Sequence, residues 1–295
     1  MSDPTLVFKN FKPTREFLVG IDSDGCAFDT MEIKHKECFI PNIIKYFGLQ
    51  KVSKYARDAA EFVNLYSKSR GANRFIALIE VFDLLRERKE VLMRNAEIPQ
   101  AQPLRDWIKK ESKLGNPTLR KYVQENNDQF MKKTLEWSEA VNNTVENIVQ
   151  GVPPFPFVRE SLEKLFLKAD IVIVSATPQQ ALEREWKEHG VDKYVALIVG
   201  QEVGSKSEIL NYVGKGKYAK DKVLMVGDAP GDLKAARENQ VLFFPVNSGH
   251  EEDSWEKFYK EVLDKFLSGI YAGDYEKALI EEFNKYLPEL PPWKK

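Results

Sequence analysis

The sequence is poor in the residues that build disulfide frameworks and zinc sites. It has two cysteines, Cys26 and Cys38, and three histidines in 295 residues. Two cysteines cannot form the several cross-links of a small secreted domain, and His35, His189 and His250 show no ligand spacing with them. This scarcity excludes a disulfide scaffold and a zinc finger. It predicts a protein of the reducing cytoplasm.

The chain also lacks an excess of charge of one sign and a long apolar run. Its 44 basic and 45 acidic residues leave a formal charge of -1, so no overall field favours nucleic acid or an anionic membrane surface. No stretch approaches the ~20 apolar residues that a membrane span needs. The N-terminal segment MSDPTLVFKNFKPTREF has no apolar signal core. We therefore expect no nucleic-acid partner and no membrane contact.

Five short apolar runs are typical of buried parallel strands. They are FLVGID at 17–22, IVIVSA at 171–176, YVALIVG at 194–200, KVLMVGD at 222–228 and VLFFPV at 241–246. Amphipathic helical segments separate the last four runs, which favours a parallel sheet covered on both faces. The sequence therefore predicts an α/β fold with a doubly wound, Rossmann-like parallel-sheet core.

Residues 31–150 carry helical periodicity and no strand pattern. In one stretch the apolar residues fall at i, i+3, i+4, i+7 and i+10, which predicts a helix with a wide buried stripe: Phe75, Leu78, Ile79, Phe82 and Leu85. The segment is long enough for a helical domain of its own, and the proline-rich GVPPFPF at 151–157 marks the return to the sheet. We predict a core of residues 1–30 and 151–295 with residues 31–150 inserted.

Polar residues gather where the predicted strands end. In open parallel sheets the ligand crevice lies beyond the carboxyl ends of the strands. The residues that follow the first four runs are carboxylates, hydroxyls and one ammonium: Asp22 and Asp24, Ser175 and Thr177, Lys206, and Asp228 and Asp232. We expect these side chains to converge at one edge of the sheet.

This combination suits phosphoryl transfer. Asp22 can attack phosphorus as a nucleophile and form an aspartyl-phosphate, which divides ester hydrolysis into two easier displacements. Asp24, two residues on, can protonate the leaving group and afterwards activate water. Because Asp22 and a phosphoryl group repel each other, we expect Mg²⁺, shared by Asp22 and Asp228.

Other residues are candidates for holding the phosphoryl group. Ser175 can donate a hydrogen bond to a phosphoryl oxygen, and Lys206 adds a fixed positive charge. Thr177 as N-cap, followed by Pro178, would aim a helix N-terminus at the anion. Structural roles are the alternatives: Lys206 as a solvated lysine in a first helical turn, Ser175 as a partner of loop backbone, and Asp232 as the N-cap of the helix LKAAREN.

These residues, in this order, resemble the haloacid dehalogenase superfamily of phosphohydrolases. The motifs are DSDG at 22–25, Ser175 after the second strand, Lys206, and GDAPGD at 227–232. Each motif is short, but four in order, each on its expected strand, form a specific pattern. The third motif departs from the family because no proline follows Lys206.

The resemblance implies a ligand set and a domain role. It implies that Mg²⁺ is bound by the carboxylates of Asp22 and Asp228 and by the backbone carbonyl of Asp24, with Asp232 in a supporting role. It also implies that residues 31–150 form a cap, which in this family selects the substrate.

The expected function is a Mg²⁺-dependent phosphatase that hydrolyses a small phosphorylated metabolite. Asp24 argues against dehalogenases and phosphonate-cleaving relatives, which lack an acid at this position, and against the ATP-driven pumps, which carry Thr. A phosphomutase of the same superfamily and a non-catalytic binding protein on the same fold remain as alternatives.

Two regions outside the core motifs also carry predictions. In SRGANRF at 69–75, Arg70 and Arg74 are candidates for gripping a distal anionic group of the substrate. The alternative makes Asn73 a helix N-cap and the arginines surface or ion-pairing residues. In the C-terminal LPELPPWKK, Trp293 is expected either in a disordered tail or packed onto the core.

Overall fold

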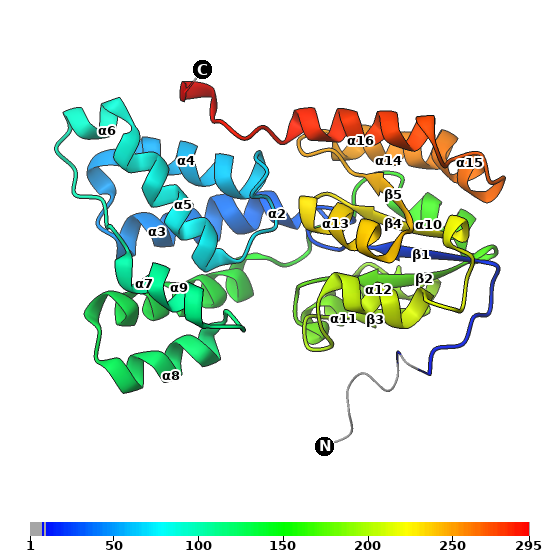
Figure 1. Cartoon of the computed structure of the whole chain (residues 1–295), viewed down its shortest axis with the longest axis horizontal. Coiled ribbons are helices and arrows are strands. Elements are labelled where there is room, and N and C mark those ends of the chain that lie inside the picture. Colours follow the sequence, from blue (N-terminus) through cyan, green and yellow to red (C-terminus); the bar gives the residue numbers. More distant parts are fainter. Residues whose placement is uncertain (1–7, 9, 295) are drawn as a thin grey trace. The chain divides into compact units, whose positions relative to one another are not determined.

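The chain divides into two compact units in the computed structural model, which describes residues 8 and 10–294 (Figure 1). The core unit comprises Met1–Met31 and Gly151–Leu287, and the helical unit comprises Glu32–Gln150 and Pro288–Lys295. This division groups Pro288–Lys295 with the helical unit, whereas the sequence analysis assigned these residues to the core. No helix among the described residues is long and apolar enough to cross a membrane.

The core unit is built on one five-stranded parallel sheet. Its strand order is β3-β2-β1-β4-β5, so the chain starts in the middle and winds outward in both directions. This confirms the predicted doubly wound α/β fold. The strands are β1 (Phe17–Ile21), β2 (Ala169–Val174), β3 (Leu197–Val199), β4 (Val223–Gly227) and β5 (Leu242–Pro245).

Helices cover both faces of this sheet, as Figure 1 shows. In β1, Val19 and Ile21 pack with one buried cluster while Leu18 packs with the other, as the alternation of side chains along a strand requires. The first cluster includes residues of α10 (Val158–Phe166), α11 (Gln179–Glu188), α14 (Glu251–Lys257), the π-helix η5 (Phe258–Val262) and α15 (Leu263–Leu267). The second includes residues of α12 (Lys206–Gly214), α13 (Pro230–Asn239) and α16 (Asp274–Tyr286). Short 3-10 turns lie at η3 (Asp192–Tyr194) and η4 (Lys220–Lys222).

The helical unit has a separate hydrophobic core. The predicted stripe lies on α5 (Arg74–Glu87), where Phe75, Phe82 and Leu85 are buried and Ile79 is partly buried. The Asn73 side chain accepts a hydrogen bond from the Phe75 amide at 3.0 Å, so it is the N-cap of this helix. The helical segments are α2 (Thr30–Ile33), η1 (Lys34–Phe39), α3 (Ile40–Tyr46), η2 (Gln50–Val52), α4 (Ser53–Leu65), α5 (Arg74–Glu87), α6 (Lys89–Met93), α7 (Gln102–Lys110), α8 (Asn116–Asn126), α9 (Gln129–Ile148) and η6 (Pro292–Lys294); of these, α2 straddles the boundary with the core unit.

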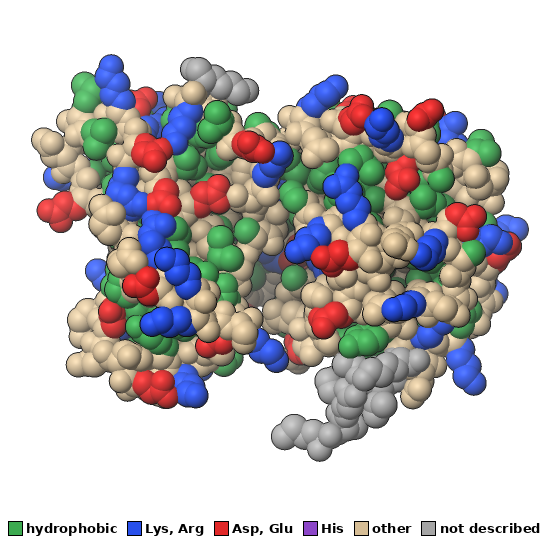
Figure 2. Space-filling view, in the orientation of Figure 1, with side chains coloured by type: hydrophobic (Ala, Val, Ile, Leu, Met, Phe, Trp, Pro, Cys, Tyr) green, Lys and Arg blue, Asp and Glu red, His purple; other side chains and the backbone are tan. Residues whose placement is uncertain are grey.

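The surface mixes charges of both signs. On the face seen in Figure 2, basic and acidic side chains are interspersed over each unit. This agrees with the balanced composition and offers no field of one sign to a polyanion on that face.

A buried carboxylate ties the segment before β1 to the sheet. Asp170 in β2 accepts hydrogen bonds at Oδ2 from the backbone amides of Thr14 (2.8 Å) and Arg15 (2.9 Å) and from the Tyr218 hydroxyl (2.6 Å). Burial tends to raise the pKa of Asp170, but the bonds from Thr14, Tyr218 and Arg15 outweigh it and place that pKa below its ordinary value.

We predict that Asp170→Asn destabilises the protein by about 1–3 kcal/mol at neutral pH, because a buried acceptor is lost and its donors are left unpaired. A carboxyl with a lowered folded-state pKa stabilises the fold above its unfolded value, near 4, and loses that contribution as the pH falls through the folded value. The melting temperatures of wild type and variant should therefore differ most at neutral pH and approach each other as the pH falls through the folded-state pKa of Asp170. The exposed Asp221→Asn is the matched control, and a pH-independent gap would contradict this account.

Candidate active site

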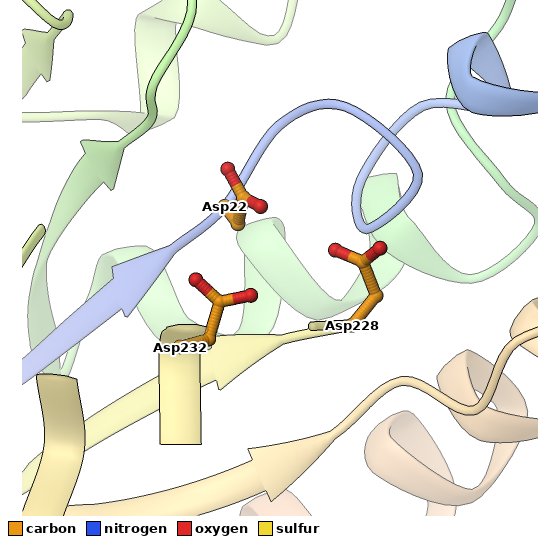
Figure 3. Close-up of side chains that lie close together, drawn as sticks. All are labelled: Asp22, Asp228 and Asp232. Atoms are coloured by element: carbon orange, nitrogen blue, oxygen red, sulfur yellow. The ribbon is translucent and has the colours of Figure 1, made fainter. Parts of the chain in front are cut away.

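Three buried carboxylates meet at the carboxyl edge of the sheet. Asp22 follows β1, Asp228 follows β4, and Asp232 lies in the first turn of α13. Their carboxyl groups turn toward a common space (Figure 3), and one oxygen from each lies within 4.8 Å of the others. All three side chains are buried. The predicted convergence at the ends of the first and fourth strands is therefore present.

The ammonium of Lys206 lies between two of these carboxylates. Its Nζ is 2.6 Å from Asp22 Oδ2 and 2.6 Å from Asp232 Oδ1. Lys206 is the first residue of α12, which Ser205 caps in a reciprocal pair of hydrogen bonds with Glu208. Because this cap fixes the start of the helix, it also fixes the position from which Lys206 reaches the acidic cluster.

The electrostatics of the cluster favour a further cation. Burial raises the pKa of Asp22 to about 6; Lys206 opposes this shift and Asp228 adds to it. Burial likewise raises the pKa of Asp232 to about 6 against the opposing effect of Lys206. Burial by itself would lower the pKa of Lys206, but Asp22, Asp232 and Asp228 raise it above its ordinary value. One ammonium therefore only partly offsets the negative charge.

Asp24 is held by two hydroxyl groups. Thr30 Oγ1 donates to Asp24 Oδ1 and Thr177 Oγ1 donates to Asp24 Oδ2, each at 2.7 Å. The prediction that Thr177 caps a helix was wrong, because α11 begins one residue later than expected and its N-cap is Pro178. The hydroxyl of Thr177 orients Asp24 instead.

The N-terminus of α11 already has an anionic partner. The backbone amide of Gln179 donates to Glu202 at 3.1 Å to Oε2 and 3.4 Å to Oε1. The first amide of the helix, which was predicted to face a phosphoryl group, is thus occupied by a carboxylate of the chain itself.

Ser175 and Asp232 each have a defined local geometry. Ser175 follows β2, is buried, and its Oγ accepts the Thr177 amide at 3.2 Å. Its hydroxyl hydrogen is therefore available for an acceptor. The alternative role of Asp232 as a helix N-cap was wrong: it is the third residue of α13, and its Oδ2 accepts a hydrogen bond from the amide of the N-cap residue Ala229 at 3.1 Å. Its second oxygen, Oδ1, accepts a hydrogen bond from Lys206 Nζ.

Side chains that the sequence analysis did not identify hold the loop after Asp22 in place. Trp186 Nε1 donates to Ser23 Oγ at 3.0 Å, and Ser23 Oγ donates to Glu185 at 3.0 Å. Trp255 Nε1 donates to the carbonyl of Cys26 at 2.6 Å. Both tryptophans are buried, and each comes from a distant part of the sequence, so no local pattern around Asp22 could have identified them.

The two arginine candidates lie in the helical unit, and each has partners there. Arg70 is buried and donates Nη1–H to the carbonyl of Leu65 at 2.9 Å. Arg74 uses Nη1 to bind Ser138 and Asn142, and its guanidinium lies 5.0 Å from the Phe39 ring centre. Burial lowers the pKa of Arg74 to about 10. These contacts give Arg74 a structural reason to be present, and a substrate role for either residue stays a prediction.

The acidic cluster has the right donors for a hard divalent cation. Asp22, Asp228 and Asp232 offer carboxylate oxygens, the ligands that Mg²⁺ prefers, and no thiolate or imidazole belongs to this group. The surplus negative charge around Lys206 also favours a divalent cation. The residues present therefore fit Mg²⁺.

Comparison with known proteins links this site to a family. Residues 100–246 match the family model described as haloacid dehalogenase-like hydrolase. The fold is similar to that of a haloacid dehalogenase-like hydrolase from Streptococcus pneumoniae, with 14% identity, a TM-score of 0.51, and coverage of 85% of this chain and 98% of that one. A candidate phosphoglycolate phosphatase from Lactobacillus delbrueckii subsp. bulgaricus gives 15% identity, a TM-score of 0.51, and coverage of 87% and 99%. No curated protein sequence matches the chain.

The family match and the geometry concern the same residues. The matched stretch contains Ser175, Lys206, Asp228 and Asp232, and the parallel sheet places Asp22 beside the last three. Together with the doubly wound fold, these findings show that the chain belongs to the haloacid dehalogenase-like hydrolases.

Proposed function

We propose that this hydrolase is a Mg²⁺-dependent phosphatase of small phosphate monoesters, with Asp22 as nucleophile and Asp24 as general acid and base. The arrangement of these two residues carries the proposal. Asp22 emerges from the central strand with Oδ1 held by the Ser23 amide at 2.8 Å and Oδ2 held by Lys206. Asp24 lies two residues on and is oriented by two hydroxyls. Both carboxyl groups are thus positioned before a substrate arrives.

In the first displacement, an oxygen of Asp22 attacks phosphorus and the bond from phosphorus to the ester oxygen breaks. The electron pair of that bond goes to the leaving oxygen, and protonated Asp24 gives it a proton. The products are an alcohol and an aspartyl-phosphate. Lys206 favours the ionised form of Asp22 needed for the attack.

In the second displacement, Asp24 removes a proton from water as the water oxygen attacks phosphorus. The bond between phosphorus and the Asp22 oxygen breaks, which regenerates the Asp22 carboxylate and releases inorganic phosphate. Asp24 ends protonated, ready for another ester, so the cycle is balanced.

The remaining site residues bind the phosphoryl group and offset its negative charge. The Ser175 hydroxyl donates to a phosphoryl oxygen, and Lys206 offsets charge on the transferring group. Asp22 and Asp228, with the Asp24 backbone carbonyl, would hold Mg²⁺. When bound, this ion stabilises negative charge on the phosphoryl oxygens.

We predict that Asp22→Asn reduces phosphate release to background, because an amide oxygen is a poor nucleophile. The measurement is phosphate release from a panel of monoesters, which includes phosphoglycolate and a generic aryl phosphate, assayed with Mg²⁺. Asp221→Asn, an exposed Asp-to-Asn change in the same unit, is the control and should keep wild-type rates. Full turnover by folded Asp22→Asn protein would refute the mechanism, and isomer formation without phosphate release would assign the chain to the phosphomutases.

We predict that Asp24→Asn lowers kcat by roughly 10²- to 10⁴-fold, the usual contribution of a general acid or base. The loss should be smaller for esters with acidic leaving groups, because these depart without a proton. Rates for an alkyl and a nitrophenyl phosphate test this. An equal loss for both esters would argue that Asp24 does not protonate the leaving group.

We predict that Mg²⁺ raises the melting temperature of the wild-type protein, because it relieves repulsion in the acidic cluster and binds only the folded state. Asp228→Asn should remove most of this rise. Thermal unfolding with Mg²⁺ or with chelator measures it without any substrate, and Asp221→Asn again serves as control. A rise that is unchanged in Asp228→Asn would place the ion elsewhere.

A further inference from the structure

The chain passes between the two units a third time after α16. The first two passages, at 31/32 and 150/151, are the entry and exit that any inserted domain requires. The third is not required, because the core unit is already complete at Leu287, which is buried in its hydrophobic core. The described residues beyond it, 288–294, belong to the helical unit, and we call them the C-terminal strap.

Trp293 anchors the strap in the helical unit. Its ring lies edge-on to Phe62 of α4 with centroids 5.9 Å apart, and the guanidinium carbon of Arg88 lies 4.3 Å from its centre. Arg88 is only 8% exposed, pairs with Asp58 at 2.9 Å and also lies over Tyr55. A cation stacked on a ring where water is excluded is a stronger contact than one on the exposed surface. The expected alternatives for Trp293, disorder or packing on the core, were both wrong.

Polar contacts line the rest of the strap. The Lys68 amide donates to the Pro288 carbonyl at 3.4 Å, Lys68 Nζ pairs with Glu289 at 2.7 Å, and Lys294 pairs with Glu87. Glu289 is largely exposed, so these ion pairs add little. Trp293 is therefore the residue whose loss should release the strap.

The strap is short and stiff. Prolines at 288, 291 and 292 remove backbone freedom between the two anchors. The six residue steps from Leu287 to Trp293 span at most ~20 Å when fully extended. Any motion that carries the two anchors more than ~20 Å apart must pull Leu287 or Trp293 from its site.

We propose that the C-terminal strap is a releasable tether that limits how far the helical unit can move from the core unit. It adds to the two covalent passages a connection of fixed reach, held at one end by burial of Leu287 and at the other by the contacts of Trp293. This inference does not depend on the proposed chemistry.

The test measures inter-unit distances in the full chain. Spin labels are placed on exposed Lys133→Cys in the helical unit and Lys234→Cys in the core unit, since both native cysteines are buried. One variant carries a Gly/Ser insert of about ten residues between Leu287 and Pro288, which leaves Trp293 in place and adds ~33 Å of reach. A second is Trp293→Ala. The matched control is Leu290→Ala, an exposed residue in the same segment.

We expect the insert and Trp293→Ala each to broaden the distance distribution toward longer values, whereas Leu290→Ala keeps the wild-type distribution. The insert variant should also keep the wild-type melting temperature, because its contacts are intact. A wild-type distribution in the insert variant would overturn the proposal, since the strap would then limit nothing. Broadening by Leu290→Ala as large as that by Trp293→Ala would also overturn it.

Discussion

The bridge from Lys206 to Asp22 and Asp232 is the interaction on which the acidic site depends. Three carboxyl groups with oxygens within 4.8 Å of one another are held in a buried place, where solvent cannot dissipate their repulsion. Lys206 favours the ionised forms of Asp22 and Asp232, but burial outweighs it and raises the pKa of each to about 6. The cluster therefore keeps surplus negative charge that favours a further cation, and this surplus links the fold to the proposed Mg²⁺ site.

Repulsion among buried carboxylates is tolerated only where the surrounding structure is rigid, and the loop after Asp22 is held in this way. The backbone amides of Cys26, Ala27 and Phe28 all donate to the carbonyl of Ser23, which coils the chain tightly after Asp22. Two buried indole N–H groups then hold this coil, one on the Ser23 hydroxyl and one on the Cys26 carbonyl. Phe28 also packs edge-on against Trp186 at 5.4 Å. The aromatic core packed against the loop thus holds the chain that follows Asp22 in one conformation.

Local features made part of this architecture predictable. A buried strand and the acid that follows it are neighbours in sequence, so the five strands and the placement of Asp22 and Asp228 could be predicted from short runs. The partners of those acids could not. Thr177 meets Asp24 across 153 residues, and Trp186 meets Ser23 across 163. A threonine beside a proline has a local reason to cap a helix, and only the folded chain shows that a distant carboxylate takes its hydroxyl instead.

The contacts of the C-terminal segment also could not be predicted from the sequence. Its apolar residues follow neither a helical nor a strand period. LPELPPW therefore predicts only that the Trp293 ring packs against some apolar surface. That cover comes from Phe62 and Arg88, which are brought together by α4 and α5 packing and not by sequence. The proposed tether also bears on the proposed reaction. Because the proposed chemistry draws on residues of the core unit alone, we expect the helical unit to act on it through substrate contact, and the proposed tether would set how far that unit can move.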